Sequence, residues 1–199
     1  MRTAFLIKIC FIAILFVKSS QVVADKYAID ETGYMNKLVF VIGASGAGKT
    51  TAVRFLEKEM KKAFTMLYFD SIGVPSPEEM GDPETWQKEK TFEWVQQLRD
   101  KYLPNGHVLF DAQTRPTFIE EACLKNKIFS YKVILIDCSD EERSLRLIGR
   151  GHAALANPTM IQWARYLRDE SKKRGYDILD NSLLDVETTA LVLKTLIEN

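Results

Sequence analysis

The sequence has few of the residues that build metal centres, redox sites and disulfide frameworks. Its 199 residues include 3 cysteines and 2 histidines. Cys10, Cys123 and Cys138 are odd in number and their spacing fits no metal or redox motif, so we expect reduced, structural thiols. His107 and His152 have no partner nearby in the sequence that would indicate a catalytic base or a metal ligand. These absences argue against a disulfide scaffold and against a cysteine-based metal site.

An excess of one charge is also lacking. The chain has 27 basic and 27 acidic residues, so its formal net charge is zero. No overall field therefore draws it to nucleic acid or to an anionic membrane, and a nucleic-acid partner would need a local basic patch. Internal repeats, low-complexity tracts and long linkers are absent as well. The length and an apolar content of 46% suit one globular α/β domain.

The chain does contain one complete phosphate-binding pattern. An apolar run over residues 38–42 leads directly into the element G-x-x-x-x-G-K-[ST], and a helical pattern follows it. Glycines let the backbone curl around phosphate oxygens, so that successive N–H groups form an anion cradle at a helix N-terminus. The pattern therefore predicts a binding site for a nucleoside triphosphate. Its residues are Gly43, Ala44, Ser45, Gly46, Ala47, Gly48, Lys49 and Thr50.

Two side chains of this element serve the phosphates directly. Lys49 would place an ammonium group at the β- and γ-phosphates, and the Thr50 hydroxyl can enter the coordination shell of Mg²⁺. Thr51 follows in the helix that we expect over residues 48–62, and we include it in the nucleotide site. The pattern thus predicts ATP and Mg²⁺ as the cofactors.

The first 36 residues differ in character from the rest. An apolar stretch over residues 4–17 and the small-residue pattern at 22–24 resemble a secretory signal cleaved before Asp25, and the stretch is short for a membrane-spanning helix. The open alternatives are an upstream extension absent from the working protein, an export signal over 1–24, and a membrane anchor. We expect residues 1–36 to lie outside the fold and residues 37–199 to form the single folded domain. Because ATP is abundant in the cytosol, a cytoplasmic location is favoured over export.

Five apolar runs are typical of buried strands, and a helical pattern follows each of them. The runs cover residues 37–42, 64–69, 107–110, 131–136 and 176–179. Strands that alternate with helices of about ten or more residues indicate parallel βαβ units with right-handed crossovers. The sequence therefore predicts an α/β fold with a five-stranded parallel sheet.

The segment between the second and third strands is longer than one crossover requires. Residues 71–104 begin with several glycines and prolines and close with a helical pattern that includes Trp86 and Trp94. An insertion here would lie over the carboxyl ends of the strands, where open α/β sheets bind ligands. We expect it to bind a second substrate. The two tryptophans fit packing roles, with Trp86 as the candidate for the wall of that pocket.

Three carboxylates follow buried strands at the edge that carries the phosphate loop. Asp70 ends the second strand, Asp111 the third and Asp137 the fourth. A single aspartate in such a place is commonly a cap or a turn residue. Three aspartates at one edge indicate that one of them has a functional role, because phosphoryl transfer from ATP needs an acidic group that orders Mg²⁺.

Three further segments resemble motifs of nucleoside monophosphate kinases such as adenylate kinase. The segment F-D-A-Q-T-R at 110–115 is similar to their L-D-G-x-P-R, and R-L-I-G-R at 146–150 is similar to the R-[IV]-x-G-R at which their lid begins. I-L-D-N-S at 178–182 resembles the late strand and loop that flank the adenine. With the phosphate loop, the likeness spans residues 37–199. It implies a P-loop NTPase fold with three layers, α/β/α.

The resemblance also implies roles for individual residues. Asp111 would hold Mg²⁺-bound water, and Arg115 would place a guanidinium on the second substrate. Arg146 would stack on the adenine, and Arg150 would clamp the phosphates. Arginine suits such roles because its fork holds two oxygens of a transferring phosphoryl group. Without the resemblance, Arg146 and Arg150 are four residues apart and would fit the solvated face of a helix over 140–149.

The departures from that family are informative. Its glycine and proline in the third-strand motif are Ala112 and Thr114 here, so the monophosphate site need not be intact. The lid, over residues 151–157, is short and resembles those of shikimate and gluconate kinases. In several such enzymes an aspartate that ends the second strand holds the acceptor hydroxyl, and Asp70 occupies that position. A carboxylate there can accept the hydroxyl proton during transfer.

The sequence thus predicts a kinase that moves the γ-phosphoryl group of ATP to a small-molecule acceptor: a nucleotide, a nucleoside or another hydroxyl metabolite. Arg165 and Arg168, on the helix expected over 158–174, would either reach the phosphates or lie on a solvated face. Two other functions stay open. A strip of Lys172, Lys173 and Arg174 would favour a polynucleotide-end kinase, and a non-catalytic ATP-binding adaptor is the alternative from another class. The acceptor and the oligomeric state are not predicted.

Overall fold

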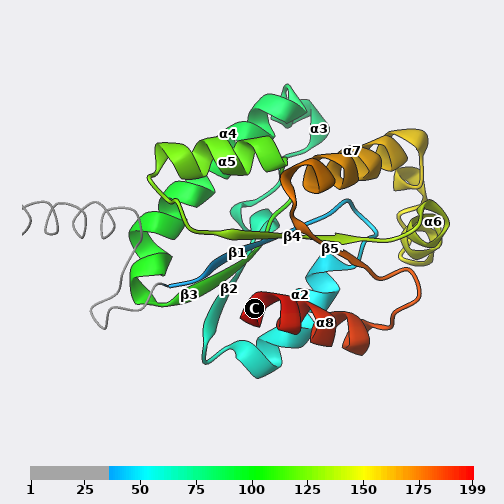
Figure 1. The fold of residues 1–199 in the computed structure, drawn as a ribbon. Helices are drawn as coiled ribbons and strands as arrows, with labels where there is room; N and C mark the ends of the chain where they lie inside the picture. The colour runs from blue at the N-terminus through cyan, green and yellow to red at the C-terminus, as the bar shows by residue number, and fades with distance from the viewer. Residues whose placement is uncertain (1–35) are drawn as a thin grey trace, which may run out of the picture.

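The protein, as a computed structural model, is described over residues 36–199 (Figure 1). The signal-like segment lies outside the described residues. The β-strands form one parallel sheet in the order β2-β3-β1-β4-β5. This confirms the predicted five-stranded parallel sheet. The strands are β1 (Leu38–Ile42), β2 (Phe64–Tyr68), β3 (His107–Asp111), β4 (Lys132–Asp137) and β5 (Asp177–Asp180).

Helices cover both faces of the sheet, so the three-layer α/β/α architecture is confirmed. In Figure 1, α2 and α8 lie on one face, and α4, α5 and α7 lie on the other. The helices are α2 (Lys49–Met60), α3 (Pro77–Met80), α4 (Pro83–Gln97), α5 (Pro116–Lys125), α6 (Asp140–Gly149), α7 (Pro158–Arg174) and α8 (Val186–Glu198). Shorter turns are the 3-10 segments η1 (Phe69–Ile72), η3 (Leu103–Asn105) and η4 (Ala153–Leu155) and the π-helical η2 (Leu98–Tyr102).

The alternation of side chains along β1 explains why the sheet needs two helical layers. Val39 and Val41 pack into the cluster formed with α2 and α8, whereas Phe40 and Ile42 pack into the cluster under α4, α5 and α7. Successive residues of a strand point to opposite faces, and in a central parallel strand both faces are buried. Every residue of β1 is accordingly buried.

The predicted element ends differ from the observed ones by one or two residues. Asp111 and Asp137 are the last residues of β3 and β4 rather than the residues after them, because both still pair with neighbouring strands. Helix α2 begins at Lys49, since Gly48 has a left-handed conformation and caps it. These shifts leave the carboxylates at the same edge of the sheet as the phosphate loop.

The insertion after β2 consists of η1, α3, α4, η2 and η3. Its inner face joins the core, because Trp94 is buried and its indole N–H donates to the Phe69 carbonyl at 3.2 Å. The short lid between α6 and α7 contains only η4. Over residues 36–199, none of the helices has the length and apolar character needed to span a membrane.

Candidate active site

The loop between β1 and α2 makes a tight turn at the carboxyl edge of the sheet. Gly43 has a φ of 154°, and a Cβ there would lie 2.3 Å from the Ile136 carbonyl oxygen of β4. Only glycine fits so close a backbone approach. The loop then delivers Lys49 and Thr50 to the first turn of α2, where the free N–H groups of a helix N-terminus favour an anion. The expected phosphate loop is therefore present as a tight turn that leads into the N-terminus of α2.

Lys49 is buried in this loop, with a residual exposure of 7%. Burial lowers the pKa of the Lys49 ammonium, while Asp111 and Asp70 oppose that shift because both carboxylates lie close enough to favour the charged form. The amine is thus held in a partly desolvated position between the loop and two acids. An anionic group that bound there would add a further opposite charge beside this cation.

Thr50 and Asp111 meet at the same edge. The Thr50 Oγ1 donates to Asp111 Oδ2 at 2.5 Å, and Asp111 is nearly buried at the end of β3. A hydroxyl beside a carboxylate is a set of hard oxygen ligands of the kind that Mg²⁺ prefers. Thr50 and Asp111 could therefore supply two oxygen ligands to a Mg²⁺ ion, which commonly keeps several of its waters.

Asp70 is the second residue after β2, in η1 instead of ending the strand, and it lines a cavity of about 290 Å³ that we call the Asp70 cavity. Burial first, and then the neighbouring Asp111 carboxylate, raise the pKa of Asp70, whereas Lys49 lowers it. The other lining residues include Lys49, Thr50, Arg54, Asp111 and Gln113. This cavity joins two acids, two cations and polar side chains.

Arg146 and Arg150 line a second cavity, of about 330 Å³, on the α8 side of the loop. We call it the Arg146 cavity. The guanidinium of Arg146 donates to the side-chain and backbone oxygens of Asn181, each at 2.9 Å, and Arg150 donates to Thr51 Oγ1 at 3.3 Å. The structure thus brings both arginines to one cavity beside the phosphate loop, together with Thr51 and the loop after β5.

A third cavity, of about 290 Å³, lies directly over the phosphate loop and is called the loop cavity. It shares Lys49, Thr50, Asp70 and Gln113 with the Asp70 cavity. It shares Gly48 and Arg150 with the Arg146 cavity, and lid residues such as His152 and Leu155 form another wall. The three cavities therefore adjoin in a row, with the phosphate loop in the middle.

Arg115 lies away from the Asp70 cavity. Its guanidinium donates to Glu84 of α4 at 2.8 Å and lies 5.0 Å from the ring centres of both Trp163 and Tyr166 of α7. Those two rings stack on each other. Trp86 packs edge-on against Phe69 instead of lining the cavity. Arg115 thus connects the insertion to α7 in this conformation.

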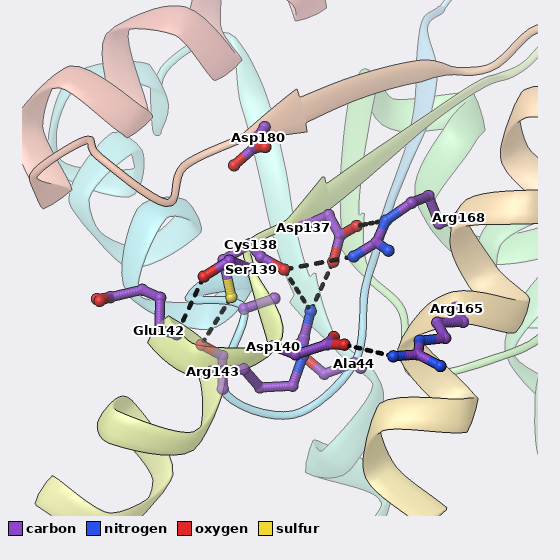
Figure 2. Close-up of polar contacts among 12 residues, drawn as sticks. Ala44, Asp137, Cys138, Ser139, Asp140, Glu142, Arg143, Arg165, Arg168 and Asp180 are labelled. Carbon is purple, nitrogen blue, oxygen red and sulfur yellow. Dashed lines mark hydrogen bonds and ion pairs between the residues drawn. The ribbon is translucent and has the colours of Figure 1, made fainter. Parts of the chain in front are cut away.

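Asp137, Arg165 and Arg168 are not among the residues that line the three cavities, and they form a separate cluster (Figure 2). Arg168 donates to Asp137 at 2.6 Å and Arg165 to Asp140 at 3.0 Å, so both arginines are paired with carboxylates of the β4 edge. In the strip after them, Arg174 is bonded to Glu120 and Glu170. Arg174 of the predicted strip is therefore paired, whereas Lys172 and Lys173 are exposed.

Sequence reasoning did not identify Arg143, Asn181 and Gln113. Asn181 donates to the Ala47 carbonyl of the phosphate loop at 2.9 Å and accepts from Arg146. Arg143 is buried beneath the loop and pairs with Asp137. A signal for Asn181 was present, because it lies in the segment that resembles the adenine-flanking loop. Arg143 gave no such signal, because acidic residues precede it in α6 and its burial beside Leu147 is evident only in the structure.

Comparison with known proteins identifies the fold. A shikimate kinase from Acinetobacter baumannii in complex with shikimate has a TM-score of 0.53 and 18% identity, and the match covers 82% of this chain and 94% of that chain. A gluconokinase from Sinorhizobium meliloti 1021 has a TM-score of 0.57 and 14% identity, with 82% and 94% covered. An APS kinase from Mycobacterium tuberculosis in complex with AMPPNP and APS has a TM-score of 0.55 and 14% identity, with 82% and 98% covered.

No family model matches the sequence, and no curated protein matches it at a significant level. The chain nevertheless has the fold of P-loop kinases, so the resemblance to this group is confirmed at the level of fold.

Proposed function

We propose that the protein is an ATP-dependent phosphotransferase that moves the γ-phosphoryl group to a small-molecule acceptor. The row of three adjoining cavities carries this proposal, because the loop cavity shares lining residues with the cavity on either side of it. A nucleoside in the Arg146 cavity would place its phosphates over the loop. An acceptor in the Asp70 cavity would then face the terminal phosphate. The fold shared with shikimate kinase, gluconokinase and APS kinase supports the same reading.

On the donor side the loop N–H groups and Lys49 would hold the phosphates, and Arg146 and Arg150 would close over the nucleotide. Thr50 and Asp111 would hold Mg²⁺, which when bound neutralises the charge that develops on the phosphate oxygens. Most of the rate enhancement in such a site comes from positioning and electrostatics, so no covalent enzyme intermediate is needed.

On the acceptor side Asp70 favours a hydroxyl group as the nucleophile. Its carboxylate lines both the Asp70 cavity and the loop cavity, so it borders the two groups that react. Burial and Asp111 raise its pKa, and a base whose pKa is nearer to the working pH transfers a proton more effectively. Asp70 would accept the proton of the acceptor hydroxyl as its oxygen bonds to phosphorus and the bond from the γ-phosphorus to the bridging oxygen of ADP breaks.

Arg115 is proposed to grip the acceptor once it leaves Glu84. The pair between them is exposed on the Glu84 side, where the carboxylate side chain keeps 60% of its surface. Exposed ion pairs contribute only about 0 to 1 kcal/mol, so an anionic group on the acceptor can compete for the guanidinium. Because the reaction consumes ATP, a cytosolic site of action is favoured.

A transfer assay with the purified full-length protein tests the proposal. ATP consumption is measured with Mg²⁺ against nucleosides, nucleoside monophosphates, sugars, sugar acids and a 5′-hydroxyl oligonucleotide, with Lys49→Met protein as the blank. Acceptor-dependent ADP release that Lys49→Met lacks would support the proposal. ATP binding without turnover on any acceptor would favour the adaptor function, and turnover on the oligonucleotide alone would favour the polynucleotide-end kinase.

A further inference from the structure

We propose that Arg143 is a positioning residue that orients the peptide groups of the phosphate loop, an inference that rests on the proposed function. Arg143 projects from α6, and its side chain is 1% exposed. It is the largest fully buried side chain of the described residues. A buried guanidinium is costly unless it is paired and hydrogen-bonded. Its contacts therefore indicate what it does.

The guanidinium of Arg143 joins the phosphate loop to the edge of β4 (Figure 2). One terminal nitrogen donates to the Ser45 carbonyl at 3.1 Å and to the Ala44 carbonyl at 3.5 Å. The other donates to Asp137 Oδ1 at 2.5 Å and to the Cys138 carbonyl at 3.3 Å. Arg143 thus anchors the outside of the loop to a buried carboxylate.

The direction of the loop carbonyl groups determines the direction of the loop N–H groups. In a trans peptide group the C=O and the N–H point in opposite directions. A donor that holds the Ala44 and Ser45 carbonyls outward therefore turns the N–H groups of Ser45 and Gly46 toward the opposite side, which is the loop cavity. Those N–H groups belong to the anion cradle. Arg143 would act on the phosphates through the backbone rather than by contact.

The packing of Gly46 points to the same contact independently. Gly46 has a φ of 83°, and a Cβ there would lie 3.0 Å from both Arg143 Cγ and Leu147 Cγ. The loop therefore rests directly on α6 at these two side chains. A change in the position of the Arg143 side chain would therefore alter the packing of the loop at Gly46.

Arg143 shares its carboxylate partner with a second arginine. Both Arg143 and Arg168 pair with Asp137, and the Asp140 and Asp169 carboxylates also act on Arg168. Arg143 is among the groups that lower the pKa of Lys49, so its field reaches the phosphate site. The matched control follows from this arrangement. Arg143→Met and Arg168→Met each remove one cation and leave Asp137 with one arginine, but only Arg143 contacts the loop carbonyls.

The test compares these two variants in the full-length protein by calorimetry with Mg²⁺-ATP. Arg143→Met should weaken binding about tenfold or more, as expected for the loss of hydrogen bonds from a charged group. Arg168→Met should weaken it less than about threefold if the charge alone is lost. Equal weakening in both variants, or wild-type affinity in Arg143→Met, would overturn the positioning role. Absence of binding by the wild-type protein would instead overturn the proposed function itself.

A kinetic comparison separates positioning from simple destabilisation. Arg143→Met should raise the KM for ATP and leave the KM for the acceptor near that of the wild type. Leu98→Ala, which creates a cavity in the core at η2, should lower stability without raising the KM for ATP. If Arg143→Met does not fold, Arg143→Lys decides by the same measurements, because one ammonium cannot replace the fork that joins Ser45 to Asp137. An unchanged KM for ATP in Arg143→Lys would then contradict the inference.

Discussion

The two sides of the candidate active site are built differently. On the donor side, side chains from remote segments hold the phosphate loop, as when Asn181 donates to Ala47 from 134 residues away. On the acceptor side, most polar contacts of the insertion are local, such as Ser76 with Glu79 and Asp82 with Thr85. The insertion joins the core mainly through its inner apolar face. The donor side is preorganised by long-range contacts, whereas the insertion contributes only Phe69, Asp70 and Ser71 to the Asp70 cavity and is otherwise held largely by local polar contacts.

This difference indicates which side of the site would provide affinity for ATP and which would provide specificity for the acceptor. A loop held from outside by several donors presents its N–H groups without reorganisation, which favours a fixed ligand such as a polyphosphate. A segment with local contacts can change in sequence without disturbing the sheet, which suits a variable acceptor. Donor-side substitutions should therefore alter the kinetic constants for ATP with every acceptor. Acceptor-side substitutions should alter those for the acceptor alone.

The largest effect is expected from Lys49→Met. Removal of the cation at the phosphates should lower kcat by about 10³-fold or more, as for other groups that stabilise transition-state charge. The melting temperature without nucleotide should not fall, because burial already disfavours the charged amine. Lys58→Met, which changes an exposed lysine of the same helix, is the control and should keep near-wild-type turnover. Near-normal turnover in Lys49→Met would show that the phosphate loop is not the donor site.

The next effect concerns Asp111, which belongs to both sides because it lines the Asp70 cavity and bonds to Thr50. Asp111→Asn should lower kcat by about 10²-fold at moderate Mg²⁺, since the amide is a weaker ligand than the carboxylate. The Mg²⁺ concentration for half-maximal rate should rise. A Mg²⁺ titration of the rate with saturating ATP measures this, and an identical titration curve would exclude Asp111 from metal binding.

Asp70→Asn should act on the acceptor side alone. Loss of a general base should lower kcat by about 10²-fold, while calorimetric affinity for Mg²⁺-ATP stays near that of the wild type. The pH profile gives a sharper test. Transfer needs the ionised carboxylate, so the wild-type rate should rise with pH through a pKa above the ordinary 3.8. That limb should be missing in Asp70→Asn, and its persistence would show that another group is the base.

The same shift sets the sign of an effect on stability. A carboxylate whose pKa is raised by folding destabilises the folded state once it ionises, so the penalty is absent below its unfolded pKa and complete above its folded pKa. Asp70→Asn should therefore stabilise the protein at neutral pH, and the gain should vanish below about pH 3.8. The gain should be small because the Asp70 carboxylate is only partly desolvated and the residue is exposed overall, so water screens its interactions. Thermal unfolding at several pH values measures it.

Much of the donor side could be predicted from the sequence because it depends on local order along the chain. A strand, a glycine-rich turn and a helix in succession define the phosphate loop, and Asp111 follows from the parallel strands that share one edge. Arg143 could not be found in this way. Its neighbours Glu141 and Glu142 make that stretch of α6 read as a solvated face, and its partners Asp137 and Ser45 come together only in the folded sheet.

Arg115 illustrates the limit on the acceptor side. Its place in the third-strand motif implied a contact with the second substrate, but its packing against α4 and α7 depends on how three helices meet. Sequence order gives the position of its backbone at the start of α5, where it is the N-cap. The direction of a long side chain with several partners within reach depends on tertiary packing.

The smallest expected effect, Glu84→Gln, tests whether Arg115 belongs to the acceptor side at all. If Arg115 must leave Glu84 to grip the acceptor, loss of this exposed ion pair should lower the KM for an anionic acceptor by about 2- to 5-fold, in line with its small free energy. Glu121→Gln, which breaks the exposed pair with Lys88 between α4 and α5, is the matched control and should leave that KM unchanged. If Arg115 only links the insertion to α7 through Trp163 and Tyr166, Glu84→Gln should also leave the KM for the acceptor unchanged. The acceptor would then have to be recognised by other residues that line the Asp70 cavity, such as Arg54 and Gln113.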